Sequence, residues 1–147
     1  MNATLAKQAL TMFLALGFSL VQGDQPLSIK GVVPGDTIDK MGQLADCSAR
    51  GGFCAGYGPY GSVPNAGFVI GYAAGKITSI GVSFSSSRSK EVLAGLTERF
   101  GPPGPGECKP GIECHTWRSN GLKLNLVMDA GGNGGVSLSG VGPVGGF

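Results

Sequence analysis

The residues of this sequence with the most distinctive chemistry are four cysteines, Cys47, Cys54, Cys108 and Cys114. Six residues separate the first two, and five separate the last two. Zinc knuckles place about two to four residues between paired cysteines, so these spacings favour disulfides over a zinc site completed by His115. Both pairs close short loops that contain glycine. We therefore predict the bonds Cys47–Cys54 and Cys108–Cys114, each worth about 2–3 kcal/mol, and no metal site.

Catalysis has one main candidate, His115, which is the only histidine of the chain. Its neighbour Cys114 belongs to a predicted disulfide, and adjacent residues of a strand point to opposite faces, so a Cys–His nucleophile pair is not expected. The run Ser85–Ser87 is better suited to capping a helix than to nucleophilic attack, because no base accompanies it. We predict that the protein is not an enzyme and uses no cofactor. The alternative is a small envelope hydrolase or ligand-binding protein that uses His115 and nearby carboxylates.

The first 23 residues have the pattern of a signal peptide. Lys7 precedes an unbroken apolar run, Ala9–Val21, and the small residue Gly23 fits a cleavage site before Asp24. The run is shorter than the roughly 20 apolar residues of a membrane-spanning helix, which makes an uncleaved anchor the weaker alternative. We predict residues 1–23 as a signal peptide, and an exported chain without a stable membrane anchor, periplasmic or secreted. An even number of cysteines fits an oxidising compartment.

The charge of the chain bears on nucleic-acid binding, and its glycine content bears on how the domain is stabilised. The formal net charge is only +2 and no basic cluster occurs, which argues against nucleic-acid binding. The chain contains 28 glycines, and glycine loses more backbone entropy on folding than any other residue. We therefore expect a small domain that depends on its disulfides for stability.

The pattern of apolar residues predicts two helices and several strands. Ile38, Met41 and Leu44 mark a short helix that begins after Asp36. A second helix begins within Ser85–Ser89 and ends at Phe100, where Gly101 and two prolines prevent its continuation. Residues 49–67 contain six glycines and two prolines and are expected to form an irregular loop. Alternating apolar residues predict a hairpin over residues 68–84, and strands over residues 115–118, 122–128 and around 136–138.

These elements repeat in the same order in two halves of the chain. Each half has a helix, a cysteine loop and a hairpin, so residues 24–147 are predicted to form a single domain made of two similar units, about 27–84 and 85–140. The predicted fold class is α+β, with tandem helix–β-hairpin units that form one antiparallel sheet and two helices on one face. The other face, which carries Lys123 and Asn125, is expected to be open.

The two helical segments also resemble a known family. VVPGDTIDKMGQL and SSSRSKEVLAGLTERFGPP are similar to the helical signature of SmpA/BamE-type outer-membrane assembly proteins. The tandem form, with a disulfide in each unit, resembles beta-lactamase inhibitor protein. The resemblance covers roughly residues 28–128 and implies an α+β sheet that binds other proteins, as an assembly factor or as an enzyme inhibitor.

Candidate binding residues are concentrated in the glycine-rich segment. Arg50, Phe53, Tyr57 and Tyr60 have the composition of adaptable recognition loops, and Lys123 and Asn125 are expected on the open face. The alternative is that the aromatic rings fold back and complete a thin core. We predict an exported protein-binding module whose partner is another, unidentified protein.

Overall fold

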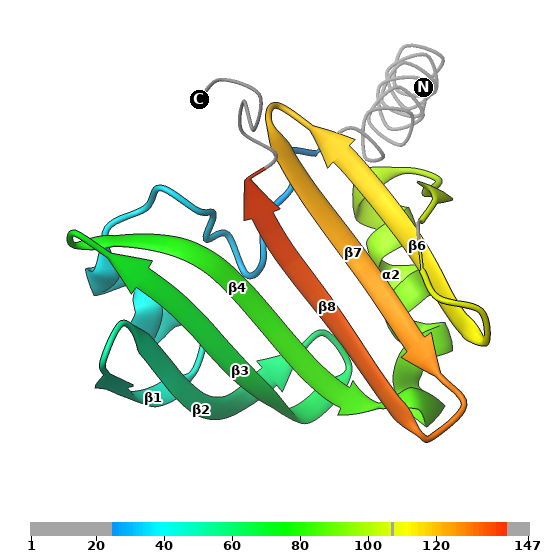
Figure 1. The fold of residues 1–147 in the computed structure, drawn as a ribbon, viewed down its shortest axis with the longest axis horizontal. Coiled ribbons are helices and arrows are strands. Elements are labelled where there is room, and N and C mark those ends of the chain that lie inside the picture. Colours follow the sequence, from blue (N-terminus) through cyan, green and yellow to red (C-terminus); the bar gives the residue numbers. More distant parts are fainter. Residues whose placement is uncertain (1–24, 107, 141–147) are drawn as a thin grey trace, which may run out of the picture.

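The structure, a computed structural model, describes residues 25–106 and 108–140, so the predicted signal peptide lies outside the described residues. These residues form one eight-stranded sheet in the order β1-β2-β3-β4-β8-β7-β6-β5, and all neighbouring strands are antiparallel (Figure 1). The strands are β1 (Asp46–Arg50), β2 (Phe53–Tyr60), β3 (Val63–Ala73), β4 (Lys76–Ser85), β5 (Gly104–Pro105), β6 (Ile112–Ser119), β7 (Leu122–Asp129) and β8 (Asn133–Gly140). The helical segments are η2 (Ile38–Gln43), η3 (Ser86–Arg88) and α2 (Ser89–Phe100).

The predicted fold class, with two helices on one face of the sheet, is wrong. Over the described residues the protein is mostly β-sheet with one α-helix, α2, while the predicted first helix is the short 3-10 segment η2. The side chain of Asp36 accepts a hydrogen bond from the backbone N–H of Val33 at 2.9 Å, and Thr37 makes no side-chain cap for η2. Gly42 further weakens the segment. The chain therefore leaves η2 early and enters β1.

The prediction of an irregular loop at residues 49–67 is also wrong, because most of this segment lies in β1, β2 and β3. Gly51 and Gly52, with φ of 45° and 94°, form the turn between β1 and β2. Gly56 is needed inside β2, because a Cβ there would lie 2.6 Å from the Cβ of Cys47. These glycines thus serve a tight turn and close strand packing rather than a loop.

The second predicted helix is confirmed as α2, preceded by η3. The hydroxyl of Ser85 accepts a hydrogen bond from the backbone N–H of Ser87 at the start of η3. At the other end Gly101 has a φ of 87°, and its N–H donates to the carbonyl of Thr97 at 2.9 Å. Gly101 also accepts a hydrogen bond from the Trp117 indole at 2.8 Å, which ties the end of α2 to β6.

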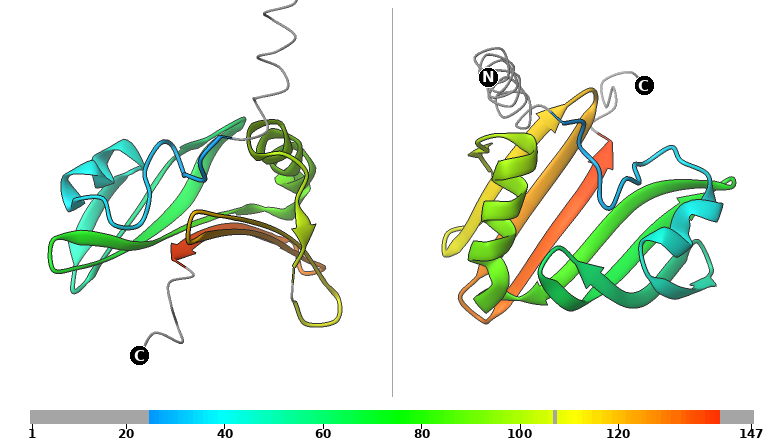
Figure 2. Two further views of the ribbon diagram at one scale, coloured as in Figure 1. Left: turned by 90° about the horizontal axis from the view of Figure 1, so that it is seen from above. Right: turned by 180° about the vertical axis from the view of Figure 1, so that it is seen from behind.

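The core lies between one face of the sheet and the helical segments. Inward side chains such as Phe68, Ile70, Leu124 and Leu138 are almost completely buried. Residues 25–45 cover this face over one half of the sheet, and α2 covers it over the other half, as the right-hand view of Figure 2 shows. The opposite face carries no helix or strand of the described residues (Figures 1 and 2). None of the described helices is long and apolar enough to cross a membrane.

The strand order divides the sheet into two halves that meet at β4 and β8. Strands β1 to β4 form one half and β5 to β8 the other, and Ile80 and Val82 of β4 pair with Leu138 and Val136 of β8. In each half a helical segment precedes four strands, and the last strand is the central one. The boundaries of two similar units at about 27–84 and 85–140 stay a prediction.

Both disulfides join the pairs that the cysteine spacing favours. Cys47 of β1 is bonded to Cys54 of β2, and Cys108 is bonded to Cys114 of β6. Cys54 is buried on the inward face, whereas Cys114 belongs to the outward face of β6.

Candidate functional site

The uncovered face of the sheet, called here the open face, carries three rows of side chains that cross the strands. Registered partners of antiparallel strands share one face, so the rows follow from the pairing. The cationic row consists of Arg50, Phe53, Gly71, Ser79, Ser139, Lys123 and Arg118. The middle row consists of Ser48, Ala55, Val69, Gly81, Ser137, Asn125 and Thr116. The third row consists of Asp46, Tyr57, Gly67, Ser83, Gly135, Val127 and Cys114.

Glycine and serine fill the centre of the open face. On β3, β4 and β8 every row position is glycine or serine except Val69. A shallow hollow of about 320 Å³ lies there, bordered by Val69, Asn125 and Val127. Gly81 has no positive φ, and a Cβ added to it would lie 3.6 Å from the carbonyl oxygen of Val69, an ordinary contact. Neither backbone conformation nor internal packing requires glycine at this position.

Exposed apolar side chains border this centre on one side. Tyr57 is 67% exposed, Val69 55% and Phe53 44%. All three lie on β2 and β3, and the Tyr57 ring lies beside Gly67, where no side chain hinders it. Among the described residues the remaining large exposed apolar side chain is Ile38, on η2 at the other face.

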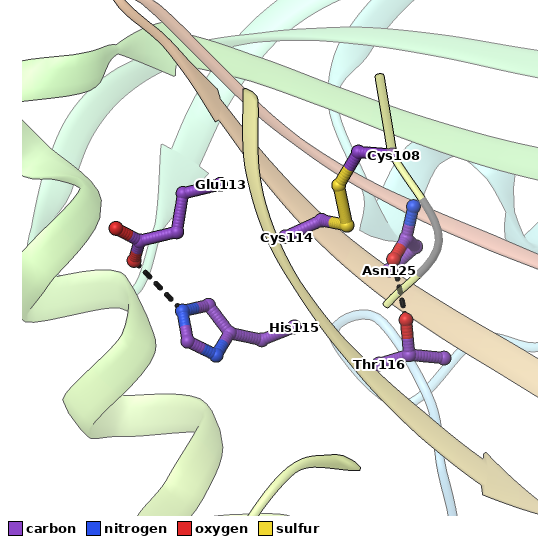
Figure 3. The surroundings of a disulfide bond; sticks show 6 residues. All are labelled: Cys108, Glu113, Cys114, His115, Thr116 and Asn125. Carbon is purple, nitrogen blue, oxygen red and sulfur yellow. Dashed lines mark hydrogen bonds and ion pairs between the residues drawn. A yellow bond between two sulfur atoms is a disulfide. The ribbon is translucent and has the colours of Figure 1, made fainter. Parts of the chain in front are cut away.

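Polar side chains border the centre on the other side. The hydroxyl of Thr116 donates to Oδ1 of Asn125 at 2.7 Å, although Thr116 is buried (Figure 3). The segment after β5 covers Thr116 so closely that a Cβ on Gly106 would lie 2.8 Å from its Oγ1 and 2.6 Å from Sγ of Cys114. The side-chain oxygen of Asn125 is therefore oriented by the buried hydroxyl of Thr116.

The structure brings five of the six predicted binding residues to one face. Arg50, Phe53 and Tyr57 lie at one side of the open face, and Lys123 and Asn125 lie at the other. They come together only through the pairing of β4 with β8. Sequence reasoning missed Val69 and Arg118, although the alternation of Val69 with Phe68 and Ile70 places it on the outward side.

Tyr60 does not belong with these residues, because its ring points into the core. It is 9% exposed and packs edge-on against Phe68, with ring centroids 6.3 Å apart and an interplanar angle of 82°. Burial raises the pKa of the Tyr60 phenol far above its usual value of 10.0. The alternative that the aromatic residues complete the core therefore applies to Tyr60 but not to Phe53 or Tyr57.

His115 lies on the inward face of β6, towards α2. Its Nε2 is 2.8 Å from Oε2 of Glu113, two residues earlier on the same strand (Figure 3). A hydrolase that uses His115 also needs a concave pocket, and His115 lines none of the four best-defined hollows of the described residues. Over the same residues no group of three or more His, Cys, Asp or Glu side chains is placed to hold a metal ion.

The largest of these four hollows, about 760 Å³, lies on the helix side between α2 and the turn from β2 to β3. Two of the four charged side chains that line it, Lys30 and Glu91, are engaged within the protein. Glu91 accepts a hydrogen bond from Ser62 and pairs with Arg88 at 3.0 Å. Lys30 donates to the carbonyl of Leu44 at 2.9 Å. The other two, Glu98 and Arg99, take part in none of the ion pairs among the described residues. In contrast to the open face, the hollow is lined by none of the large exposed apolar side chains of the described residues.

No protein-family model matches the chain, and comparisons with curated proteins and with solved structures find no match either.

Proposed function

We propose that this protein is an exported protein-binding module and that its open face receives another protein. The observation that carries the proposal is the cluster of Phe53, Tyr57 and Val69, three large apolar side chains exposed together on a sheet face that no helix or strand of residues 25–106 and 108–140 covers. Exposed apolar surface of this kind marks interaction sites in small proteins. Aromatic residues are also enriched where protein interfaces are most buried.

The glycine and serine centre supports the same conclusion. Glycine inside a strand costs about 0.5–1 kcal/mol relative to alanine and often marks a place where another backbone approaches closely. Gly81 incurs this cost without any requirement of φ or packing. A flat centre between the aromatic residues and the Lys123–Asn125 side suits a partner segment that lies across the strands.

Export rests on the sequence and on the disulfides. Disulfides persist in oxidising compartments, and the chain has two of them after an N-terminal segment with the signal-peptide pattern. We therefore propose a periplasmic or secreted location. Within this proposal two roles are considered, envelope assembly and enzyme inhibition. They are the roles implied by the resemblance to SmpA/BamE-type proteins and to beta-lactamase inhibitor protein.

Affinity capture from the native envelope and culture fluid tests the proposal. Tagged wild-type protein is compared with the double variant Phe53→Ser/Tyr57→Ser, and captured proteins are quantified by mass spectrometry. We expect recovery of the specific partner to fall about tenfold or more, because truncating aromatic anchors at an interface typically costs above 1–2 kcal/mol.

Ile38→Ser is the matched control, because Ile38 is a large exposed apolar side chain on the other side of the molecule. This variant is expected to recover the partner as well as the wild type does. Equal recovery by the wild type and by Phe53→Ser/Tyr57→Ser would refute the role of the open face.

A further inference from the structure

The cationic row ends in two like charges that face each other. Arg118 of β6 and Lys123 of β7 are directly opposite in the register, and Ser139 and Ser79 continue the row towards the centre of the sheet. Like charges directly opposite each other on neighbouring strands destabilise a sheet. Such a pair is unfavourable unless something outside the sheet compensates it.

The described part of the chain supplies no such compensation. Its ion pairs are Lys40–Asp36, Arg88–Glu91 and His115–Glu113, and none of them includes Arg118, Lys123 or Arg50. The cationic and middle rows contain no carboxylate. Most of the described carboxylates lie near η2, on α2 or on the inward side of β6, namely Asp36, Asp39, Glu91, Glu98 and Glu113.

We propose that Arg118 and Lys123 bind the carboxylates of an acidic, extended segment of the partner protein. The inference rests on the proposed function, since it names the chemistry of what the open face receives. Carboxylates between the two cations would replace a repulsion by two charge-assisted hydrogen bonds. The hydroxyls of Ser139 and Ser79, next in the row, offer further donors along the path of the segment.

The geometry of the row also specifies the spacing in the partner segment. Five strand intervals separate Arg118 from Phe53, and strands lie about 4.8 Å apart, so the two ends of the path are about 24 Å apart. An extended chain covers this distance in about seven residues. The segment is thus expected to place acidic residues about seven positions away from an apolar residue that contacts Phe53.

A protein segment fits these features better than a nucleic acid or a lipid surface. The row has only three cations, and at the end away from Lys123 and Arg118 the cation Arg50 lies beside the exposed ring of Phe53. Nucleic-acid sites instead line up many cations along a phosphate backbone. Electrostatic contacts of this kind chiefly set orientation and partner choice.

An NMR titration tests the inference with a hexaglutamate peptide as the probe and a hexaserine peptide as its uncharged counterpart. Hexaglutamate is expected to shift the amide signals of Arg118, Lys123 and Ser139 saturably, and hexaserine is expected to shift none of them. In the variant Arg118→Gln/Lys123→Gln the apparent Kd for hexaglutamate should rise about tenfold at low salt. Raising the salt concentration to about 0.5 M should weaken the binding of hexaglutamate to the wild type. The matched control Lys90→Gln/Arg99→Gln removes two exposed cations from α2 and should bind as the wild type does.

Absence of saturable shifts, or an equal loss in the control variant, would overturn the inference. Tighter binding of a six-residue oligothymidylate, or binding of phosphatidylglycerol vesicles without binding of hexaglutamate, would also overturn it in favour of another polyanion. Phe53→Ser/Tyr57→Ser is expected to keep its affinity for hexaglutamate. A negative titration together with partner capture that depends on Phe53 and Tyr57 would therefore refute the acidic segment alone, and leave the proposed function standing.

Discussion

Replacing Gly81 by threonine is expected to make the protein more stable and at the same time less able to bind its partner. Gly81 lies in the middle of the open face, between Val69 of β3 and Ser137 of β8. Its backbone has no positive φ, so threonine fits the existing conformation. The new side chain projects into the shallow hollow, where the partner segment is expected to lie.

The gain in stability follows from three terms. Removing glycine from a strand interior contributes about 0.5–1 kcal/mol, and threonine is favoured in strands. A cross-strand contact with Val69 adds a few tenths of a kcal/mol, and the nearest contact of the new Cβ, 3.6 Å to the carbonyl oxygen of Val69, involves no clash. The sum is about 1 kcal/mol, which raises Tm by about 4 °C for a domain of this size.

Urea denaturation under non-reducing conditions measures this gain, and affinity capture measures partner recovery, which is expected to fall about tenfold. Gly56→Ala is the contrasting variant on the inward side of the sheet. A Cβ at Gly56 would lie 2.6 Å from the Cβ of Cys47, so this variant should lose about 3 kcal/mol. If Gly81→Thr is destabilised, or gains stability while partner recovery is unchanged, the assignment of the centre of the open face as a binding surface is refuted.

Three further predictions concern stability. Removing the first disulfide by Cys47→Ala/Cys54→Ala should lower the free energy of unfolding by about 2–3 kcal/mol in urea, because the bond closes a short loop in the unfolded chain; an unchanged urea midpoint would contradict this. Trp117→Phe should cost about 1 kcal/mol in the same assay through loss of the 2.8 Å hydrogen bond to the Gly101 carbonyl, and a neutral effect would show that this bond does not hold the end of α2. Hydrogen bonds from Ser62 and, to a smaller extent, Arg88 lower the pKa of Glu91 below its usual 4.5. The ionised Glu91 therefore stabilises the folded state above pH 4.5, and this stabilisation is lost as the pH falls through the lower pKa of the folded state. Urea midpoints measured between pH 6 and about pH 3 should therefore fall less steeply for Glu91→Gln than for the wild type, and parallel curves would refute the role of Glu91.

The sequence by itself determined the elements whose signals are local. Helix α2 follows from the serine cap, its apolar stripe and Gly101, which are all within about 17 residues of one another. Strand β7 follows from the alternation of apolar and polar residues over Leu122–Leu126. The disulfide pairs follow from short spacings that only neighbouring chain segments can close. In each case the information is contained in a short window of sequence.

Only the tertiary structure decided the remaining features, because they depend on partners far away in the chain. The glycine-rich segment forms β1 and β2 because β3 and the residues before β1 pack closely against it, a contact that no local propensity indicates. The same segment turns Tyr60 inward and Tyr57 outward, which separates one predicted binding residue from the rest. The open face itself exists only because β4 pairs with β8, since this pairing joins Phe53 and Tyr57 in one half of the sheet to Lys123 and Arg118 in the other.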